Sequence, residues 1–296
     1  FGIVAYIGFL DRPGTPSGIP SEELDQYITE VAIEADQGRM AKAFDALDKA
    51  IREAGPLGDR PTQRFRIIGI SLASLFAPER SPPQAMHALV QSSLADLARI
   101  QDVDHPETTF RLLIAAYFAA RQGDAAMATN LLARDLVEAK AGAGYPVISQ
   151  MRKVVEAEIF RAGGEPDRAV ATLKPMVDGT ELQIVRVALM DAYAEAKQDA
   201  AALEQARWLS THRGRAYAEA NVQRMLTPFN VVQTDLALLR EAELSSALGM
   251  HDEARRALSD FERAWPEAGA IDYLRARLAT LRTAVPTREG PAPSRT

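Results

Sequence analysis

The stretch GEPDRAVATLKPMV, residues 164–177, carries the pattern that predicts the fold of this chain. Gly164 is followed five residues later by Ala169, and then by Leu173 and Met176. Glycine readily ends a helix in a left-handed conformation, a small alanine lets the next helix lie close to the previous one, and apolar residues three or four apart form a buried stripe. The stretch is therefore typical of the turn and second helix of an antiparallel helix pair.

The same spacing occurs at four other places in the chain. It is found as Gly38, Ala43 and Leu47 in GRMAKAFDALDKAI, as Gly123, Ala128 and Leu132 in GDAAMATNLL, as Gly249, Ala254 and Leu258 in GMHDEARRALSDFE, and, with the glycine lost, as Lys197, Ala202, Ala206 and Leu209 in KQDAAALEQARWL. Each pair covers one apolar face and leaves another, so repeated pairs must stack on their neighbours. Since residues 21–285 have helical period and no strand-length alternation, the sequence predicts an all-α fold, an α-solenoid of antiparallel helix pairs.

The helix-breaking residues divide this region into units. We expect one domain over 21–284 made of about six helix pairs and a closing helix that caps the last apolar face. The pairs are predicted at 21–55, 61–102, 107–141, 146–178, 180–212 and 230–265, and the C-terminal capping helix at 268–284. Residues 285–296 contain three prolines and predict a disordered tail.

The first ten residues, FGIVAYIGFL, are uncharged. A membrane span needs roughly 20 apolar residues, so residues 1–10 predict the end of a truncated transmembrane helix; a signal-peptide segment or an apolar arm packed on the domain is the alternative. Residues 11–20 are rich in proline and glycine and predict a linker. From Asp11 to Gln37 the only Lys or Arg is Arg12. Because cytoplasmic flanks of a span are usually basic, we expect an inner-membrane protein with a periplasmic repeat domain, and a cytoplasmic domain is the alternative.

Composition excludes several functions. The formal net charge is -6 and no long run of Lys and Arg occurs, so we expect no nucleic-acid partner. The chain has no cysteine, which excludes disulfides, thiolate metal sites and thiol catalysis. The four histidines have no metal-ligand spacing and no phosphate-binding glycine loop is present. We therefore predict no cofactor and no metal.

Catalytic motifs are also weak. GISLA, residues 69–73, has the outline of a nucleophile elbow, but it lies inside a predicted helix, so Ser71 is expected to be a packed helix residue. DVDHPE, residues 102–107, has the residue types of a metal site but is better explained as a helix cap. The chain shown is not predicted to be an enzyme.

The repeat pattern resembles the tetratricopeptide repeat (TPR) family over most of residues 21–265. Trp265-Pro266 falls where that family often has a terminal proline, and Tyr27 and Tyr193 fall on its aromatic positions. The resemblance implies a right-handed superhelix whose first helices line a concave groove that binds a protein or peptide segment. It places on that groove Phe110, Leu113, Tyr117, Met151, Val154, Glu158, Arg161, Ile184, Asp191, Leu236 and Glu243. The Lys and Asn pattern of carboxylate-clamp members is missing.

Three acidic residues of that groove keep a second class of function open. If Glu158, Asp191 and Glu243 converge, the chain would be a helical-repeat enzyme or a solenoid that binds a small ligand in a carboxylate-lined pocket. General acid-base catalysis requires such groups within reach of one substrate. A homo-oligomer also stays open.

The segment THRGRAYAEANVQRMLTPFN, residues 211–230, adds about 17 residues between the fifth and sixth pairs. It carries His212, Arg213, Arg215 and Arg224. One hypothesis is a contact with an anion or an acidic peptide. The alternative is a helix end whose basic residues face the negative end of a helix dipole.

Residues 208–265, with HRGRAY, also resemble the C-terminal repeat region of bacterial peptide modification system cyclases. None of the cyclase residues is present, so no activity is implied for this chain. The resemblance implies the sensory or regulatory C-terminal half of a membrane-anchored signalling or peptide-modification protein. One-pass regulators with a winged-helix domain and an outer repeat domain have a similar architecture.

Overall fold

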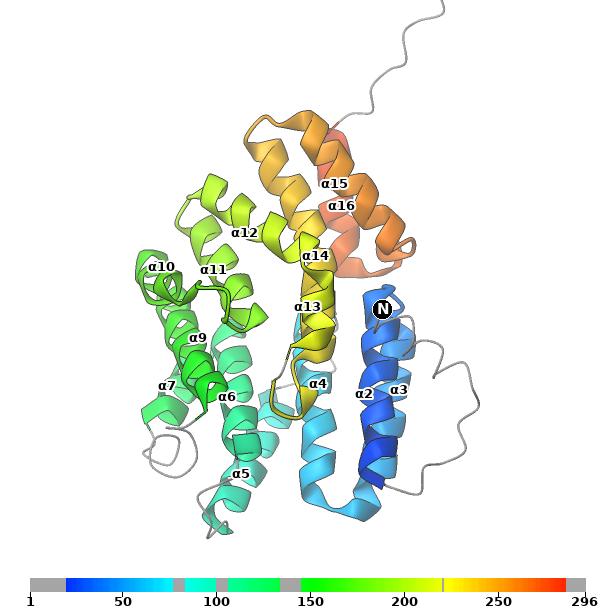
Figure 1. The fold of residues 1–296 in the computed structure, drawn as a ribbon, viewed down its shortest axis with the longest axis vertical. Coiled ribbons are helices and arrows are strands. Elements are labelled where there is room, and N and C mark those ends of the chain that lie inside the picture. The colour runs from blue at the N-terminus through cyan, green and yellow to red at the C-terminus, as the bar shows by residue number, and fades with distance from the viewer. Residues whose placement is uncertain (1–19, 77–82, 100–105, 134–144, 220, 286–296) are drawn as a thin grey trace, which may run out of the picture.

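The computed structural model describes residues 20–76, 83–99, 106–133, 145–219 and 221–285. This part of the chain contains 14 α-helices and no strand, which confirms the all-α prediction (Figure 1). The first helices are α2 (Pro20–Asp36), α3 (Met40–Ala54), α4 (Asp59–Phe76), α5 (Pro83–Arg99), α6 (Pro106–Arg121) and α7 (Ala125–Ala133). The others are α9 (Pro146–Ala162), α10 (Pro166–Leu173), α11 (Gln183–Glu195), α12 (Asp199–Thr211), α13 (Arg213–Ala218), α14 (Thr227–Ala247), α15 (His251–Ala264) and α16 (Asp272–Ala284). Four short 3-10 helices lie between them, namely η1 (Gly55–Leu57), η3 (Lys174–Met176), η4 (Val222–Arg224) and η5 (Ala268–Ala270).

Consecutive helices pack against one another along the chain. In α3 the buried residues include Met40, Ala43, Leu47 and Ala50, which are spaced by three or four and form one stripe. In α11 and α6 most residues are buried, because these helices have neighbours on several sides. The packing order is consistent with a helical array.

The turns inside five of these helix pairs share one backbone geometry. Gly38, Gly123, Gly164 and Gly249 have φ between 71° and 92°, the left-handed region that glycine tolerates. At each turn the next residue donates its N–H to the carbonyl oxygen five residues back, at 2.8–2.9 Å, as in a Schellman motif. Lys197, where the sequence lacks the glycine, has φ 60° and the same bond follows it, from Gln198 N–H to the Tyr193 oxygen. The turn is therefore kept at the expense of a strained lysine.

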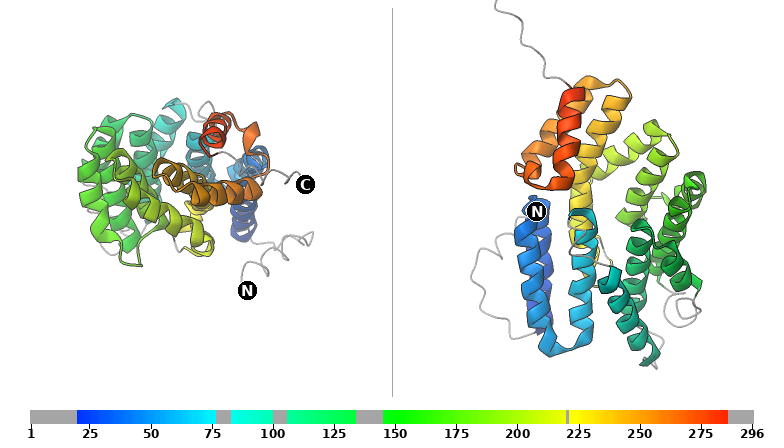
Figure 2. Two further views of the ribbon diagram at one scale, coloured as in Figure 1. Left: turned by 90° about the horizontal axis from the view of Figure 1, so that it is seen from above. Right: turned by 180° about the vertical axis from the view of Figure 1, so that it is seen from behind.

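Helix α14 joins the two ends of the chain. It packs against α11, α12 and α15, and also against α2 and α4 (Figures 1 and 2). Every residue from 225 to 237 is buried, as expected for a helix with neighbours on all sides. The sequence predicted a helix pair starting near 230 but not this return contact with the N-terminal pair.

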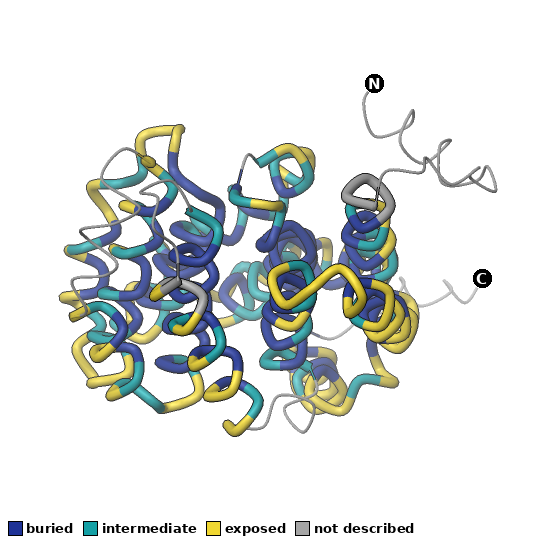
Figure 3. The backbone as a smooth tube through the Cα atoms, turned by 90° about the horizontal axis from the view of Figure 1, so that it is seen from below, coloured by how far each residue is buried: buried dark blue, intermediate teal, exposed yellow. Residues whose placement is uncertain are grey.

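The apolar core has two large clusters. One is built mainly from α6, α9, α11 and α12, and the other from α2, α3 and α4 together with α14, α15 and α16. Buried positions lie where the helices face each other, and exposed positions lie on the outside (Figure 3). Since α14 contributes Phe229 to the first cluster and Val232 to the second, this helix links both clusters.

Several predicted segments lie outside the described residues. These are the truncated transmembrane helix at 1–10, most of the linker at 11–20, and nearly all of the tail at 285–296. Among the residues that are described, no helix is both long and apolar enough to span a membrane.

Candidate functional site

The apolar members of the predicted groove are buried. Their exposed fractions run from 0 to 8% for Phe110, Leu113, Tyr117, Met151, Val154, Ile184 and Leu236. Tyr117 on α6 lies against Phe229 of α14, with ring centroids 6.4 Å apart, and Phe118 lies 5.3 Å from the same ring. At Tyr117 the place predicted for a partner is therefore taken by the chain's own α14, and these apolar side chains contribute to the core instead of an open surface.

The charged members of the predicted groove form a network around Arg121 of α6. Its Nη1 lies 2.9 Å from Tyr117 Oη, 2.9 Å from Asp191 Oδ2 on α11 and 3.9 Å from Glu158 Oε2 on α9. Two of the three carboxylates singled out in the sequence thus converge on one guanidinium. Arg121 itself was missed, although it lies one helical turn after Tyr117 and should share its face.

Arg161 extends this network on α9. It donates to both oxygens of Glu158 at 3.0 and 2.5 Å, and it also pairs with Glu195 of α11. The Glu158 side chain is 1% exposed, whereas that of Glu195 is 45% exposed. The bidentate pair lies within α9 and orients the Arg161 guanidinium, and the Arg161–Glu195 pair links α9 to α11.

The third carboxylate, Glu243 on α14, lies in a second group of charges. It accepts from Arg277 of α16 at 2.8 and 2.9 Å and from Arg240 at 3.3 Å. The charge of Arg240 also acts on Asp191, so the two groups are electrostatically connected. We call the whole set the charge ladder; its members are Tyr117, Arg121, Glu158, Arg161, Asp191, Glu195, Arg240, Glu243 and Arg277.

The charges of the ladder decide what chemistry it can do. Burial would raise the pKa of Asp191, but Arg121 and Arg161 outweigh burial and hold this pKa below its ordinary value. Burial would likewise raise the pKa of Glu243, but Arg277 outweighs burial and holds this pKa below its ordinary value. Both carboxylates are ionised and paired at neutral pH, which suits electrostatic binding and not proton transfer.

The inserted segment contacts the rest of the chain through its basic residues. Arg215 donates to the Gly179 oxygen at 3.0 Å and to the Glu181 oxygen. Arg224 donates to Thr29 Oγ1 on α2 at 3.1 Å, and Arg213 pairs with Asp36 of the same helix at 2.7 Å. The three arginines predicted as an anion contact are thus engaged by the chain itself.

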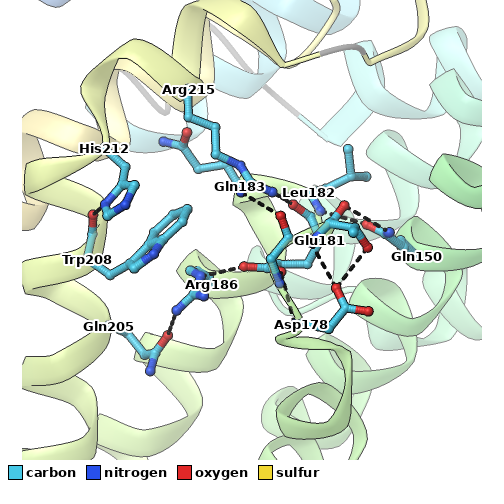
Figure 4. Close-up of polar contacts among 12 residues, drawn as sticks. Gln150, Asp178, Glu181, Leu182, Gln183, Arg186, Gln205, Trp208, His212 and Arg215 are labelled. Carbon is cyan, nitrogen blue, oxygen red and sulfur yellow. Dashed lines mark hydrogen bonds and ion pairs between the residues drawn. The ribbon is translucent and has the colours of Figure 1, made fainter.

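His212 has a different environment from these arginines. Its ring stacks on Trp208 with centroids 4.2 Å apart and planes 10° apart, and the Arg186 guanidinium lies 3.9 Å from the Trp208 ring centroid (Figure 4). Arg186 in turn donates to Glu181 (Figure 4), and Glu181 also accepts from the Gly179 N–H at 2.6 Å. The insertion is therefore tied to the loop before α11 by a stack of π and charge contacts.

The two motifs with catalytic or metal-binding residue types, GISLA and DVDHPE, gain no support as sites. The Ser71 hydroxyl is buried in α4 and donates to the Ile67 oxygen at 2.8 Å. The segment 102–105 lies outside the described residues, and α6 begins at Pro106. Within the described ranges, no group of three or more His, Asp or Glu side chains could hold a metal ion.

We compared the chain with known protein families, proteins and structures. No family model, no curated protein and no solved structure matches the chain.

Proposed function

We propose that the chain is a TPR-like α-solenoid whose helix pairs form a right-handed superhelix, and that it binds a peptide or protein segment along the charge ladder. The observation that carries this proposal is a connected row of charges from α6, α9, α11, α14 and α16 that remains partly open to solvent. The exposed fractions of Arg121, Arg240 and Glu195 are 21, 33 and 45%.

Partial exposure matters because it allows side chains of the ladder to bond to another molecule. A fully buried ion pair is costly to break, whereas a partly exposed side chain can form a hydrogen bond with an incoming charged side chain. Arg240 is the best contact of this kind, since its side chain is 33% exposed and its Nη1 makes only a long contact, 3.3 Å, with Glu243. A segment with an acidic side chain opposite Arg240 would be held in one register.

The enzyme alternative finds less support in the same residues. Arg121 and Arg161 lower the pKa of Asp191, and a carboxylate that stays ionised and paired cannot serve as a proton donor near neutral pH. Interaction with a protein is the function that the ladder fits best.

A photo-crosslinking experiment tests the ladder. A crosslinking amino acid placed at Glu195 in the full-length gene should capture a discrete protein, while one placed at Lys49, an exposed residue on α3, should not. Arg240→Glu should weaken that capture at least tenfold, because it opposes the acidic contact. Arg263→Glu, at a 74% exposed side chain on α15, is the matched control and should not weaken it. Equal capture from Glu195 and Lys49, or equal loss in both variants, would disprove the proposal.

We further propose that the chain is the regulatory half of a membrane-anchored protein, with the helical domain in the periplasm. Support comes from the apolar residues 1–10 and the linker after them. Since the chain has no cysteine, Lys49→Cys introduces a single thiol into it. Labelling by a membrane-impermeant maleimide in intact spheroplasts is expected; labelling only after lysis would place the domain in the cytoplasm.

A further inference from the structure

Two carboxylates meet under one guanidinium where α2 contacts α13 and α14. Arg213 Nη2 lies 2.7 Å from Asp36 Oδ1, and its Nη1 lies 3.0 Å from Asp235 Oδ1. Asp36 is at the end of α2 and Asp235 is in the fully buried half of α14. We call this group, with Tyr217 and Trp265, the clasp, because it joins the N-terminal helix pair to the C-terminal part of the chain.

The two carboxyl groups of the clasp are shielded from water, whereas the Arg213 side chain is 42% exposed. The side chain of Asp235 is 0% exposed and that of Asp36 is 14% exposed. Trp265 is buried, and its Nε1 donates to both Asp235 Oδ2 and the Asp36 carbonyl oxygen at 3.1 Å. A Tyr217 side-chain hydrogen bond also reaches Asp36.

The balance of charge in this enclosed space favours a bound proton. The charged groups that act on Asp235 are Asp36 from α2 and Arg213 from α13, and Tyr217 from α13 interacts with the same residues. One positive charge therefore faces two carboxyl groups. Burial raises the pKa of Asp235 to about 7; Arg213 opposes this shift and the Asp36 carboxylate adds to it. Like-charged carboxylates in contact cannot both ionise freely when water is excluded.

We propose that Asp235 holds a proton beside Asp36 when the clasp is closed, so that α2 and α3 are released from α14 as that proton leaves. No bond is made or broken apart from this proton, which passes to solvent. The device is independent of the charge ladder, since it uses none of the ladder residues. It makes the contact between the two ends of the chain depend on pH.

The sign of the effect follows from linkage. A carboxyl group with a higher pKa in the closed state than in the open state stabilises the closed state at low pH, and this stabilisation is lost as pH rises to the closed-state value. The ordinary pKa of an aspartate is 3.8, and that of Asp235 in the clasp is about 7. Opening should therefore increase by up to about tenfold for each pH unit between 5 and 7 and level off above 7.

Hydrogen-deuterium exchange of the full chain, corrected for the intrinsic effect of pH, measures this opening. Peptides from α2 and from residues 261–271 should lose protection between pH 5 and 7. Asp235→Asn, which mimics the protonated acid, should remove most of that dependence. Asp36→Asn is a second variant and should also flatten it, because Asp235 then pairs with Arg213 alone.

Glu219→Gln is the matched control. Glu219 is a partly buried carboxylate whose pKa is also raised by burial, but it accepts hydrogen bonds from the Gln183 N–H and from Asn230 instead of from a clasp residue. This variant should keep the pH dependence of α2. Protection of α2 that does not change between pH 5 and 7, or a dependence removed by Glu219→Gln but not by Asp235→Asn or Asp36→Asn, would overturn the proposal.

Discussion

The stack of helices from α6 to α12 and the seam between α2 and α14 are held together differently. In the stack, Gly164 and its neighbours make a turn whose contacts are local: the Glu165 N–H bonds to the Phe160 oxygen at 2.9 Å. At the seam, Gly38 makes the same turn, but Trp265 lies directly against it, and an alanine Cβ there would be 2.8 Å from the indole. The same turn therefore only reverses the chain at Gly164, whereas at Gly38 it also packs against Trp265, a residue far away in the sequence.

The comparison shows why the repeat pattern is informative in one region and not in the other. Spacing between glycine, alanine and leucine reports how a helix pair folds on itself. This spacing does not show which other helix pair the outer surface of a pair will pack against. At the seam the packing depends on Trp265 and Arg213, single residues outside the repeated Gly, Ala and Leu positions.

The largest expected effect separates the two turns. Gly38→Ala should destabilise the protein by about 3 kcal/mol, because it combines a left-handed alanine with a clash against a buried indole. Gly164→Ala has the same strain, with φ 77°, but nothing lies within 4 Å of its Cβ, so about 1 kcal/mol is expected. Urea unfolding of both variants measures the difference. Equal losses would mean that Trp265 moves aside at no cost.

A smaller effect is expected from the ion pairs of the seam. Arg213→Met should cost about 2 kcal/mol, since it removes the ion pair with Asp36 and leaves the buried Asp235 without its cation. Arg263→Met, which removes an exposed pair with Asp260, should change stability little. Thermal unfolding at pH 7 compares the two. If both variants unfold at the wild-type temperature, the seam is not held by its charges.

The smallest effect lies within the stack and has the opposite sign. Lys197→Gly should stabilise the protein by about 0.5–1 kcal/mol, because glycine relieves the strain of φ 60° but loses more freedom on folding. Lys153→Gly, in the interior of α9, should instead destabilise by about 1 kcal/mol. Chemical denaturation resolves both changes. A loss of stability in Lys197→Gly would show that the lysine makes contacts that compensate its strain.

Much of the helical organisation could be predicted because it depends on neighbours in sequence. The glycines at 38, 123, 164 and 249 are positioned as turn residues should be, and even the turn at Lys197 follows the pattern without its glycine. The stripe of α3 shows the same agreement, as Ala43 and Leu47 are both buried.

The candidate site could be predicted only in part. Glu158 and Asp191 do converge, but the partners that make them a network, Arg121 and Arg240, carry no repeat signal. The groove prediction assumed that these residues face an open surface. In the structure Phe229 of α14 packs against Tyr117, which periodicity within a single helix cannot show.

The sequence by itself determined that this chain is helical, where the repeated turns lie, and which stripe of a second helix such as α3 is buried. Those properties arise from backbone conformation and from contacts within a few residues, so they are written in local spacing. Only the tertiary structure decided that α14 returns to α2, that the insertion joins the two ends, and that Asp36 meets Asp235. Such contacts join residues that lie far apart in the sequence, so the spacing within either segment does not encode them.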